Sequence, residues 1–138
     1  MQEKILFLTI FHYLYIIQNI AEKPKSFFEE VLFKALTQKG ENLVQEFKIT
    51  KIEPTKQGKQ DYILIDFKYE LLTGAGFTVD RKGVASVTSE GDAVEALWSA
   101  SIAKRYKKTE SQLRTITSSF RCYAEGLKFS IPEVKDFS

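Results

Sequence analysis

The chain has very few of the residues from which disulfides, zinc clusters and catalytic triads are built. Its 138 residues include one cysteine, Cys122, and one histidine, His12. A single cysteine excludes an intrachain disulfide and a cysteine-based zinc cluster. A Ser/His/Asp triad would have to use His12, which lies in an apolar segment where a charged imidazole is costly. We therefore expect a protein that is not an enzyme, with Cys122 as a small buried residue and His12 packed in the core or in an interface.

The chain also has little net charge. Its 20 basic and 18 acidic residues leave a formal charge of +2, a balance that does not indicate nucleic-acid binding. Hydrophobic residues make up 43% of the sequence and charged residues 28%, as in ordinary globular proteins. The sequence contains no internal repeat or low-complexity tract, and its length fits a single domain with one core.

No apolar run reaches the roughly 20 residues that a membrane-spanning helix needs. The segment Ile5–Ile17 is apolar except for Thr9 and His12, and three interpretations of it remain open. In the first, it is a buried strand or helix, since Ile, Phe, Tyr and Thr favour strands. In the second, it is the hydrophobic region of a targeting signal, although Met1–Lys4 has no net positive charge and no Ala-x-Ala site follows. In the third, it is an artefactual start.

Strand patterns dominate the middle of the chain. In the segment Tyr62–Leu71, apolar side chains alternate with Asp66, Lys68 and Glu70, as in an antiparallel strand with one solvated face. Turn residues then follow at Gly74–Gly76, which no Lys-Ser/Thr follows and which is therefore not a phosphate loop. The complete set of predicted strands is Leu43–Ile52, Tyr62–Leu71, Phe77–Thr88 and Ala93–Ser101, with a polar loop at Pro54–Gln60.

Two segments have helical patterns. Ser26 and Glu29 have the spacing of a capping box, an apolar stripe follows, and Gly40 is a typical helix stop. Apolar residues recur at helical spacing in Thr109–Phe120, where the stripe is Leu113, Ile116 and Phe120. We expect Trp98 to lie in the core under this last helix, with Phe120 close to it.

Four short motifs lie on these elements: Ser26-Phe27-Phe28-Glu29-Glu30, Arg81-x-x-Val84-Ala85-x-Val87, Lys104-Arg105-Tyr106-x-Lys108 and Ser118-Ser119-Phe120-Arg121. In this order, the elements and motifs resemble the PsbP family. The resemblance spans residues 26–123 and corresponds to the C-terminal two-thirds of the family's domain. Tyr106 stands where Trp is more usual in the family.

The resemblance implies an α+β fold, an antiparallel meander flanked by helices in an α/β/α sandwich. The Gly-Phe and Pro-Trp motifs of the family's first strands have no counterpart, which favours a truncated or alternatively started, N-terminally incomplete form. The expected division is an apolar leader or extra strand or helix at residues 1–21, a partial PsbP-like domain at 22–126 and a C-terminal tail at 127–138.

The resemblance also implies a function: a non-enzymatic extrinsic protein of the chloroplast thylakoid lumen, peripheral to the membrane and without a membrane span. Such proteins associate with photosystem subunits, either at the oxygen-evolving complex of photosystem II, where they help retain Ca²⁺ and Cl⁻, or during photosystem assembly. The departures from the family pattern favour a divergent member, and no transit peptide is visible. Cystatin-like, nuclear-transport-factor-like and Ran-binding-like interaction modules remain alternatives, since a helix followed by an antiparallel meander also suits them.

One charged cluster is the main candidate for binding a partner. Its members are Lys104, Arg105, Lys107 and Lys108, with Arg81 and Lys82 as neighbours. Cations this close repel one another, so an acidic protein surface or an anionic lipid face would relieve them, and a solvated helix entrance is the alternative.

Three acidic residues are weak candidates for binding a metal ion. Asp80, Glu90 and Asp92 offer carboxylate oxygens to a hard cation, and Ca²⁺ is implied by the resemblance alone. Because Ca²⁺ takes about 6–8 oxygens, ordinary turn chemistry is the alternative for Glu90 and Asp92.

Overall fold

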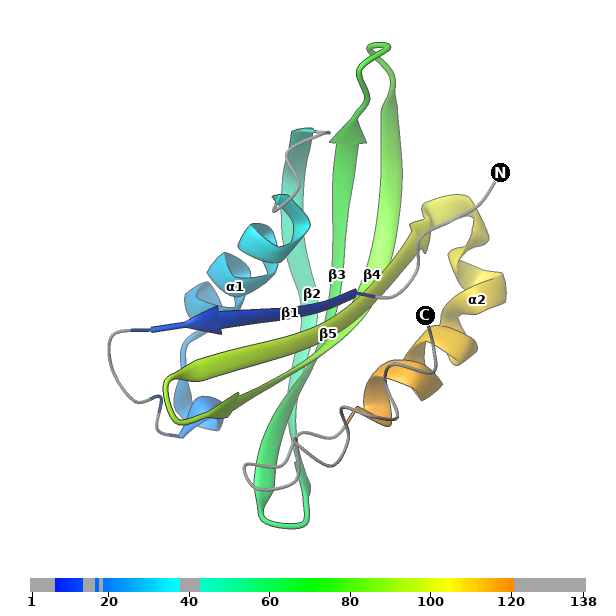
Figure 1. The fold of residues 1–138 in the computed structure, drawn as a ribbon. Helices are drawn as coiled ribbons and strands as arrows, with labels where there is room; N and C mark the ends of the chain where they lie inside the picture. Colours follow the sequence, from blue (N-terminus) through cyan, green and yellow to red (C-terminus); the bar gives the residue numbers. More distant parts are fainter. Residues whose placement is uncertain (1–6, 14–16, 18, 38–42, 121–138) are drawn as a thin grey trace, which may run out of the picture.

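The computed structural model has a five-stranded antiparallel sheet with helices packed against it (Figure 1). It describes residues 7–13, 17, 19–37 and 43–120. The strand order is β1-β5-β4-β3-β2, so the last four strands form a meander and β1 is added beside β5. In chain order the elements are β1 (Phe7–His12), the 3₁₀ helix η1 (Ile20–Glu22), α1 (Lys25–Thr37), β2 (Leu43–Gln57), β3 (Gln60–Leu72), β4 (Thr78–Glu90), β5 (Ala93–Ile102) and α2 (Ala103–Ser118).

The four predicted strands are therefore confirmed, and within the apolar N-terminal segment residues Phe7–His12 form a strand, as one of its interpretations had it. In β1, Thr9 pairs with Ala96 and Phe11 with Val94 of β5. Thr9 and Ala96 are both buried, whereas Leu8 is 58% exposed, which is the alternation of a strand with one covered face. β1 thus covers the hydrogen-bonding edge that β5 would otherwise present to solvent.

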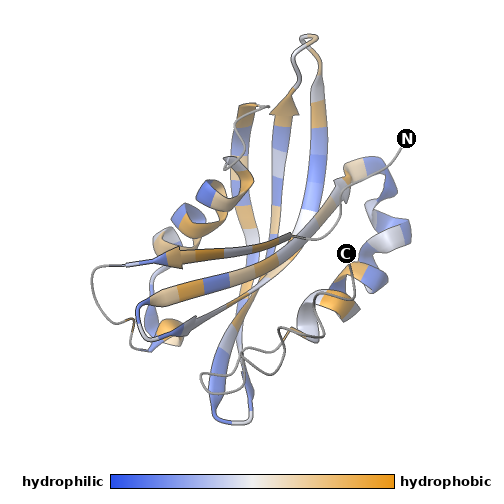
Figure 2. Ribbon diagram, viewed as in Figure 1, coloured by the Kyte–Doolittle hydropathy of each residue, from blue (hydrophilic) through white to orange (hydrophobic). Residues whose placement is uncertain are grey.

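The main core lies between the sheet and α1. Alternate residues of β3 point to this face, and Trp98 of β5 belongs to the same cluster. Figure 2 shows hydrophobic and hydrophilic positions following one another along the strands. Phe28, Val31 and Leu32 of α1 are at most 1% exposed and belong to the same cluster. The buried members of the cluster are Ile17, Ile20, Phe28, Val31, Leu32, Ala35, Val44, Ile49, Ile63, Ile65, Phe67, Tyr69, Ala85, Val87, Val94, Ala96, Trp98 and Ala100.

The opposite face of the sheet is covered by α2. Val84 of β4 forms a second, smaller buried cluster with Tyr106 and Leu113 of α2. Beyond the end of α2, the ring of Phe120 meets Tyr62 edge-on, with 6.1 Å between the ring centroids. Since Val84 and Tyr62 belong to the set of strand residues that faces away from α1, the helices lie in separate layers, as the α/β/α interpretation expects.

The structure corrects the predicted position of Trp98. Its ring contacts Phe67 in the α1-side core, at 6.3 Å between centroids, instead of lying under the last helix. The reason is strand parity: Trp98 pairs with Ala85, whereas α2 packs on Val84, the next residue of β4. Phe120 is consequently paired with Tyr62 and not with Trp98.

The polar segment Pro54–Gln60 was predicted to be a loop, and that prediction is wrong. β2 continues to Gln57 and β3 begins at Gln60, so the connection is a tight turn in which Gly58 has a φ of 64°. β2 is an edge strand, and an edge position tolerates Pro54, which has no N–H to donate. The hydrophilic residues are the solvated outer part of a long hairpin.

His12 does not lie in the core, which was one of the two predicted alternatives. Its side chain is 72% exposed, and Nδ1 lies 3.7 Å from Oδ1 of Asp92, which is 55% exposed. His12 ends β1 with its side chain on the outward face, beside exposed Ile10.

Both helices begin earlier than predicted. α1 begins at Lys25, which places Ser26 inside the first turn instead of at the cap, and α2 begins at Ala103 instead of Thr109. The predictions for Gly40, Cys122 and the tail 127–138 lie outside the described residues.

Candidate functional site

The first turns of α2 carry a dense group of cations. Lys104, Arg105, Lys107 and Lys108 are all exposed, while Tyr106 between them is 9% exposed. The first turn has no acidic residue, so the positive end of the helix dipole adds to these charges. The helical period therefore turns one aromatic ring inward and leaves the cations on the solvent side.

Tyr106 anchors this group to the sheet. Its ring packs with Val84 and Leu113, and Nζ of Lys82 lies 5.9 Å from the ring centroid. Burial raises the pKa of the Tyr106 hydroxyl to about 12, against the opposing effect of the Arg114 charge. The contact with Tyr106 brings Lys82 of β4 to the start of α2.

Arg81 differs from its neighbour Lys82 because consecutive strand residues point to opposite faces. Its Nε donates to the Tyr69 hydroxyl at 2.9 Å, and its Nη2 donates to the Ala100 carbonyl at 3.1 Å. Burial raises the pKa of Tyr69, and the charge and hydrogen bond of Arg81 oppose that rise. The guanidinium of Arg81 is thus engaged within the protein, apart from the cations of α2.

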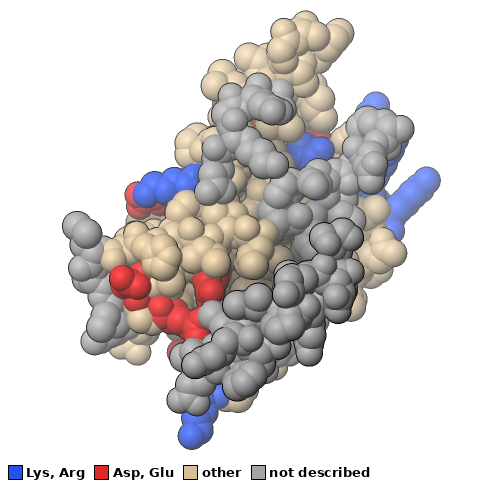
Figure 3. All heavy atoms as spheres, in the orientation of Figure 1, with Lys and Arg blue, Asp and Glu red and all other residues tan. Residues whose placement is uncertain are grey.

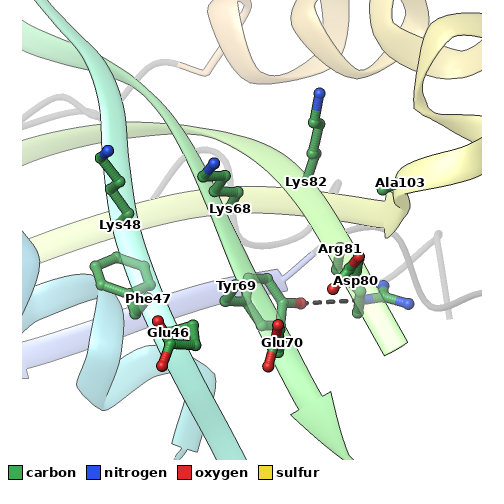
Figure 4. Close-up of a pocket in the computed structure, with 10 residues that line it drawn as sticks. All are labelled: Glu46, Phe47, Lys48, Lys68, Tyr69, Glu70, Asp80, Arg81, Lys82 and Ala103. Atoms are coloured by element: carbon green, nitrogen blue, oxygen red, sulfur yellow. Dashed lines mark hydrogen bonds between the residues drawn. The ribbon is translucent and has the colours of Figure 1, made fainter. Parts of the chain in front are cut away.

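Two lysines that the sequence did not single out lie in line with Lys82. Lys48 of β2 pairs with Lys68 of β3, Lys68 pairs with Lys82 of β4, and Lys82 pairs with Ser101 of β5 (Figure 4). This row across three strands depends on the register of two hairpins, including an irregularity between Gln45 and Lys48 where Glu46 has a φ of 54°. Alternation alone could show that Lys68 is solvated, but not that it stands between two other lysines.

The lysine row borders a cleft of about 600 Å³ beside the start of α2. Ala103, the first residue of α2, lines it together with residues of β2, β3 and β4. Figure 3 shows how charged groups are distributed over one face of the molecule, among residues of other kinds. The residues that line the cleft are Glu46, Phe47, Lys48, Lys68, Tyr69, Glu70, Asp80, Arg81, Lys82 and Ala103.

The three acidic candidates for metal binding do not converge. Glu90 and Asp92 flank the β4–β5 turn, whereas Asp80 lies ten residues back along β4, roughly 33 Å for an extended chain. The part of the chain that the structure describes contains no group of three or more His, Cys, Asp or Glu residues able to hold a metal ion. Asp80, Glu90 and Asp92 therefore do not come together in one cluster.

Comparison with solved structures finds the same fold in another protein. The chain matches the solution structure of cyanobacterial PsbP (CyanoP) from Synechocystis sp. PCC 6803 with a TM-score of 0.55 and 19% sequence identity. The match covers 86% of this chain and 66% of that chain, so this chain spans less than two-thirds of the matched protein's length. The fold is therefore PsbP-like, as the sequence predicted.

No family model matches the chain, and no curated protein matches it in sequence. Among the described residues, no helix is both long and apolar enough to cross a membrane.

Proposed function

We propose that this protein is a non-enzymatic, PsbP-like extrinsic protein of the photosynthetic membrane. It resides in the thylakoid lumen and docks on photosystem subunits, either at the oxygen-evolving complex of photosystem II or during photosystem assembly. Support comes from the PsbP-like fold together with a basic surface made of Lys82, Lys104, Arg105, Lys107 and Lys108. The concentration of cations at the start of α2 is the observation that carries the docking proposal.

The charge balance of the chain makes this concentration significant. The formal charge of the whole chain is +2, yet four of its cations fall in one stretch of five residues, 104–108. Like charges at this spacing raise the free energy of the unbound protein, and an acidic partner surface lowers it again while accelerating encounter. Because Tyr106 holds α2 against β4, these charges are presented by a rigid part of the fold.

Binding to isolated thylakoid membranes tests this proposal. We expect the bound fraction to fall steeply as salt rises, because the Debye length shrinks from about 10 Å at 0.1 M to about 3 Å at 1 M. The double variant Lys107→Glu/Lys108→Glu should bind at least about tenfold more weakly and keep the melting temperature of the unaltered protein. Membranes without photosystems, prepared from a non-photosynthetic source, should bind little protein at any salt concentration.

The double variant Lys25→Glu/Lys59→Glu is a matched control. It makes the same change in net charge at two exposed lysines, one at the start of α1 and one in the β2–β3 turn. We expect this control to retain binding, because neither lysine belongs to the basic surface. Salt-insensitive binding, or equal loss in both double variants, would contradict docking through α2.

A further inference from the structure

Repulsion between the charges of Lys48, Lys68 and Lys82 raises the free energy of the unbound protein. Each lysine stands directly opposite the next in the strand register, and all three are exposed. Neighbouring strands lie about 4.8 Å apart, so the three Cα atoms span roughly 10 Å. Like charges placed directly opposite each other in a sheet are destabilising.

The acidic residues of the same cleft do not neutralise this row. Within the described part of the chain, none of the three lysines forms an ion pair with Glu46, Glu70 or Asp80, all of which line the cleft with them. Figure 4 shows the three amines extending in one direction along the strands and the carboxylates of Glu46 and Glu70 extending in the opposite direction. Glu70 instead accepts a hydrogen bond of 3.2 Å from Nε2 of Gln45.

We propose that this lysine row is a binding site for a compact, multivalent phosphate-bearing anion. Each ammonium group is a point charge with three rotatable donors, which suits a phosphate group approached from several directions. Flexible stems allow three amines that start roughly 10 Å apart to converge on one anion. The cleft beside the row, about 600 Å³, lies within the volume range of small-molecule sites.

The spacing favours a compact anion over an acidic peptide. The lysines succeed one another at the distance between strands, about 4.8 Å, whereas carboxylates on one face of an extended peptide recur about every 6.7 Å. The carboxylates of Glu46, Glu70 and Asp80 beside the row would also repel a long acidic chain laid across the cleft. This site shares Lys82 with the basic surface, but Lys48 and Lys68 are not part of that surface, so variants of Lys68 test the site apart from the docking proposal.

Titration with inorganic pyrophosphate at constant ionic strength tests the site. We expect pyrophosphate to bind and to raise the melting temperature, because a ligand of the folded state stabilises it. Lys68→Gln, in the middle of the row, should weaken binding by at least about fivefold. Without pyrophosphate this variant should melt at the same or a higher temperature, since it removes the central repulsion.

Lys34→Gln on α1 is the control, because it removes one exposed cation outside the cleft and should leave pyrophosphate binding unchanged. Vesicles of phosphatidylglycerol, compared with phosphatidylcholine vesicles, distinguish the source of the phosphate. Vesicle binding that Lys68→Gln abolishes, without pyrophosphate binding, would assign the site to a lipid headgroup.

Three outcomes would overturn the proposal: no binding of either probe, equal effects of Lys68→Gln and Lys34→Gln, or polyglutamate binding with the same dependence on Lys68. Lys107→Glu/Lys108→Glu should leave pyrophosphate binding intact, so the fate of this proposal and that of the docking proposal can be told apart.

Discussion

Asp66 on β3 and Arg114 on α2 form a bidentate ion pair between residues 48 positions apart in the chain. Nη1 of Arg114 donates to Oδ1 of Asp66 at 2.9 Å, and Nη2 donates to Oδ2 at 2.8 Å. Nε of Arg114 also donates to Oε2 of Glu110 at 2.8 Å. The hydrogen bonds to Asp66 raise the pKa of Arg114 more than burial lowers it. This pair fixes the helix that carries the basic surface over the central strands.

Breaking this pair should destabilise the protein modestly. Arg114 is 43% exposed and Asp66 22% exposed, so solvent screens the interaction. We expect Arg114→Gln and Asp66→Asn each to lower the free energy of unfolding, with a coupling energy of about 0.5–1 kcal/mol in a double-mutant cycle. Denaturant midpoints of the two single variants and the double variant measure that coupling. A coupling energy of zero would show that the pair contributes nothing to the position of α2.

Gly83 is required by close packing against Phe67. A Cβ atom at this position would lie 2.5 Å from the carbonyl oxygen of Ser99, 2.6 Å from Cζ of Phe67 and 2.9 Å from Cβ of Ala100. We therefore expect Gly83→Ala to lower the free energy of unfolding by about 1–3 kcal/mol, as overpacking does. Gly74→Ala is the matched control, since its Cβ would meet nothing within 4 Å. Equal melting temperatures for the two variants would contradict this packing argument.

The layers of the fold could be predicted from sequence because alternation and helical spacing are local. The alternation in β3 correctly placed Phe67 and Tyr69 on a buried face and Lys68 in solvent. Which helix covers that face is not local information. Trp98 was assigned to the wrong layer because its position depends on whether Ala85 or Val84 of β4 faces α2.

The candidate site was predicted only where its residues are adjacent in the chain. The cations of residues 104–108 are visible as a cluster in the sequence, and Lys82 was included as a neighbour. The row that Lys82 forms with Lys48 and Lys68 requires the registers of two hairpins, one of which contains irregularities. Sequence patterns identify faces of strands, but pairing partners follow from turn lengths and bulges.

Removal of β1 should expose the edge of β5. β1 pairs with β5 from Phe7↔Trp98 to His12↔Ala93, so deleting residues 1–12 leaves the N–H and C=O groups of β5 that face β1 without partners, while those that face β4 stay paired. Such an edge pairs readily with other chains. We expect the shortened protein to aggregate or to lose cooperative unfolding, as measured by light scattering and denaturant titration.

Deletion of residues 1–6 alone keeps the paired strand and is the control for the β1 deletion. If the protein lacking residues 1–12 remained monomeric and melted at the original temperature, β1 would be dispensable.

Alkaline pH should destabilise the contact between α2 and β4 through Tyr106. Burial raises the pKa of its hydroxyl from 10.0 to about 12 in the folded protein. Below pH 10 the hydroxyl is protonated in both folded and unfolded chains, so stability does not depend on it. Between pH 10 and 12 the unfolded chain loses this proton while the folded protein keeps it, and the free energy of unfolding must fall.

The variant Tyr106→Phe separates this effect from the ionisation of other groups. It keeps the ring that packs on Val84 and Leu113 but has no proton to lose. We expect its stability to decline less than that of the unaltered protein between pH 10 and 12, as measured by urea midpoints at each pH. In an ultraviolet titration, Tyr106→Phe should have one fewer tyrosine that ionises at high pH than the unaltered protein has. Parallel declines in the two proteins would mean that Tyr106 ionises as freely when folded as when unfolded, and that α2 does not bury its hydroxyl.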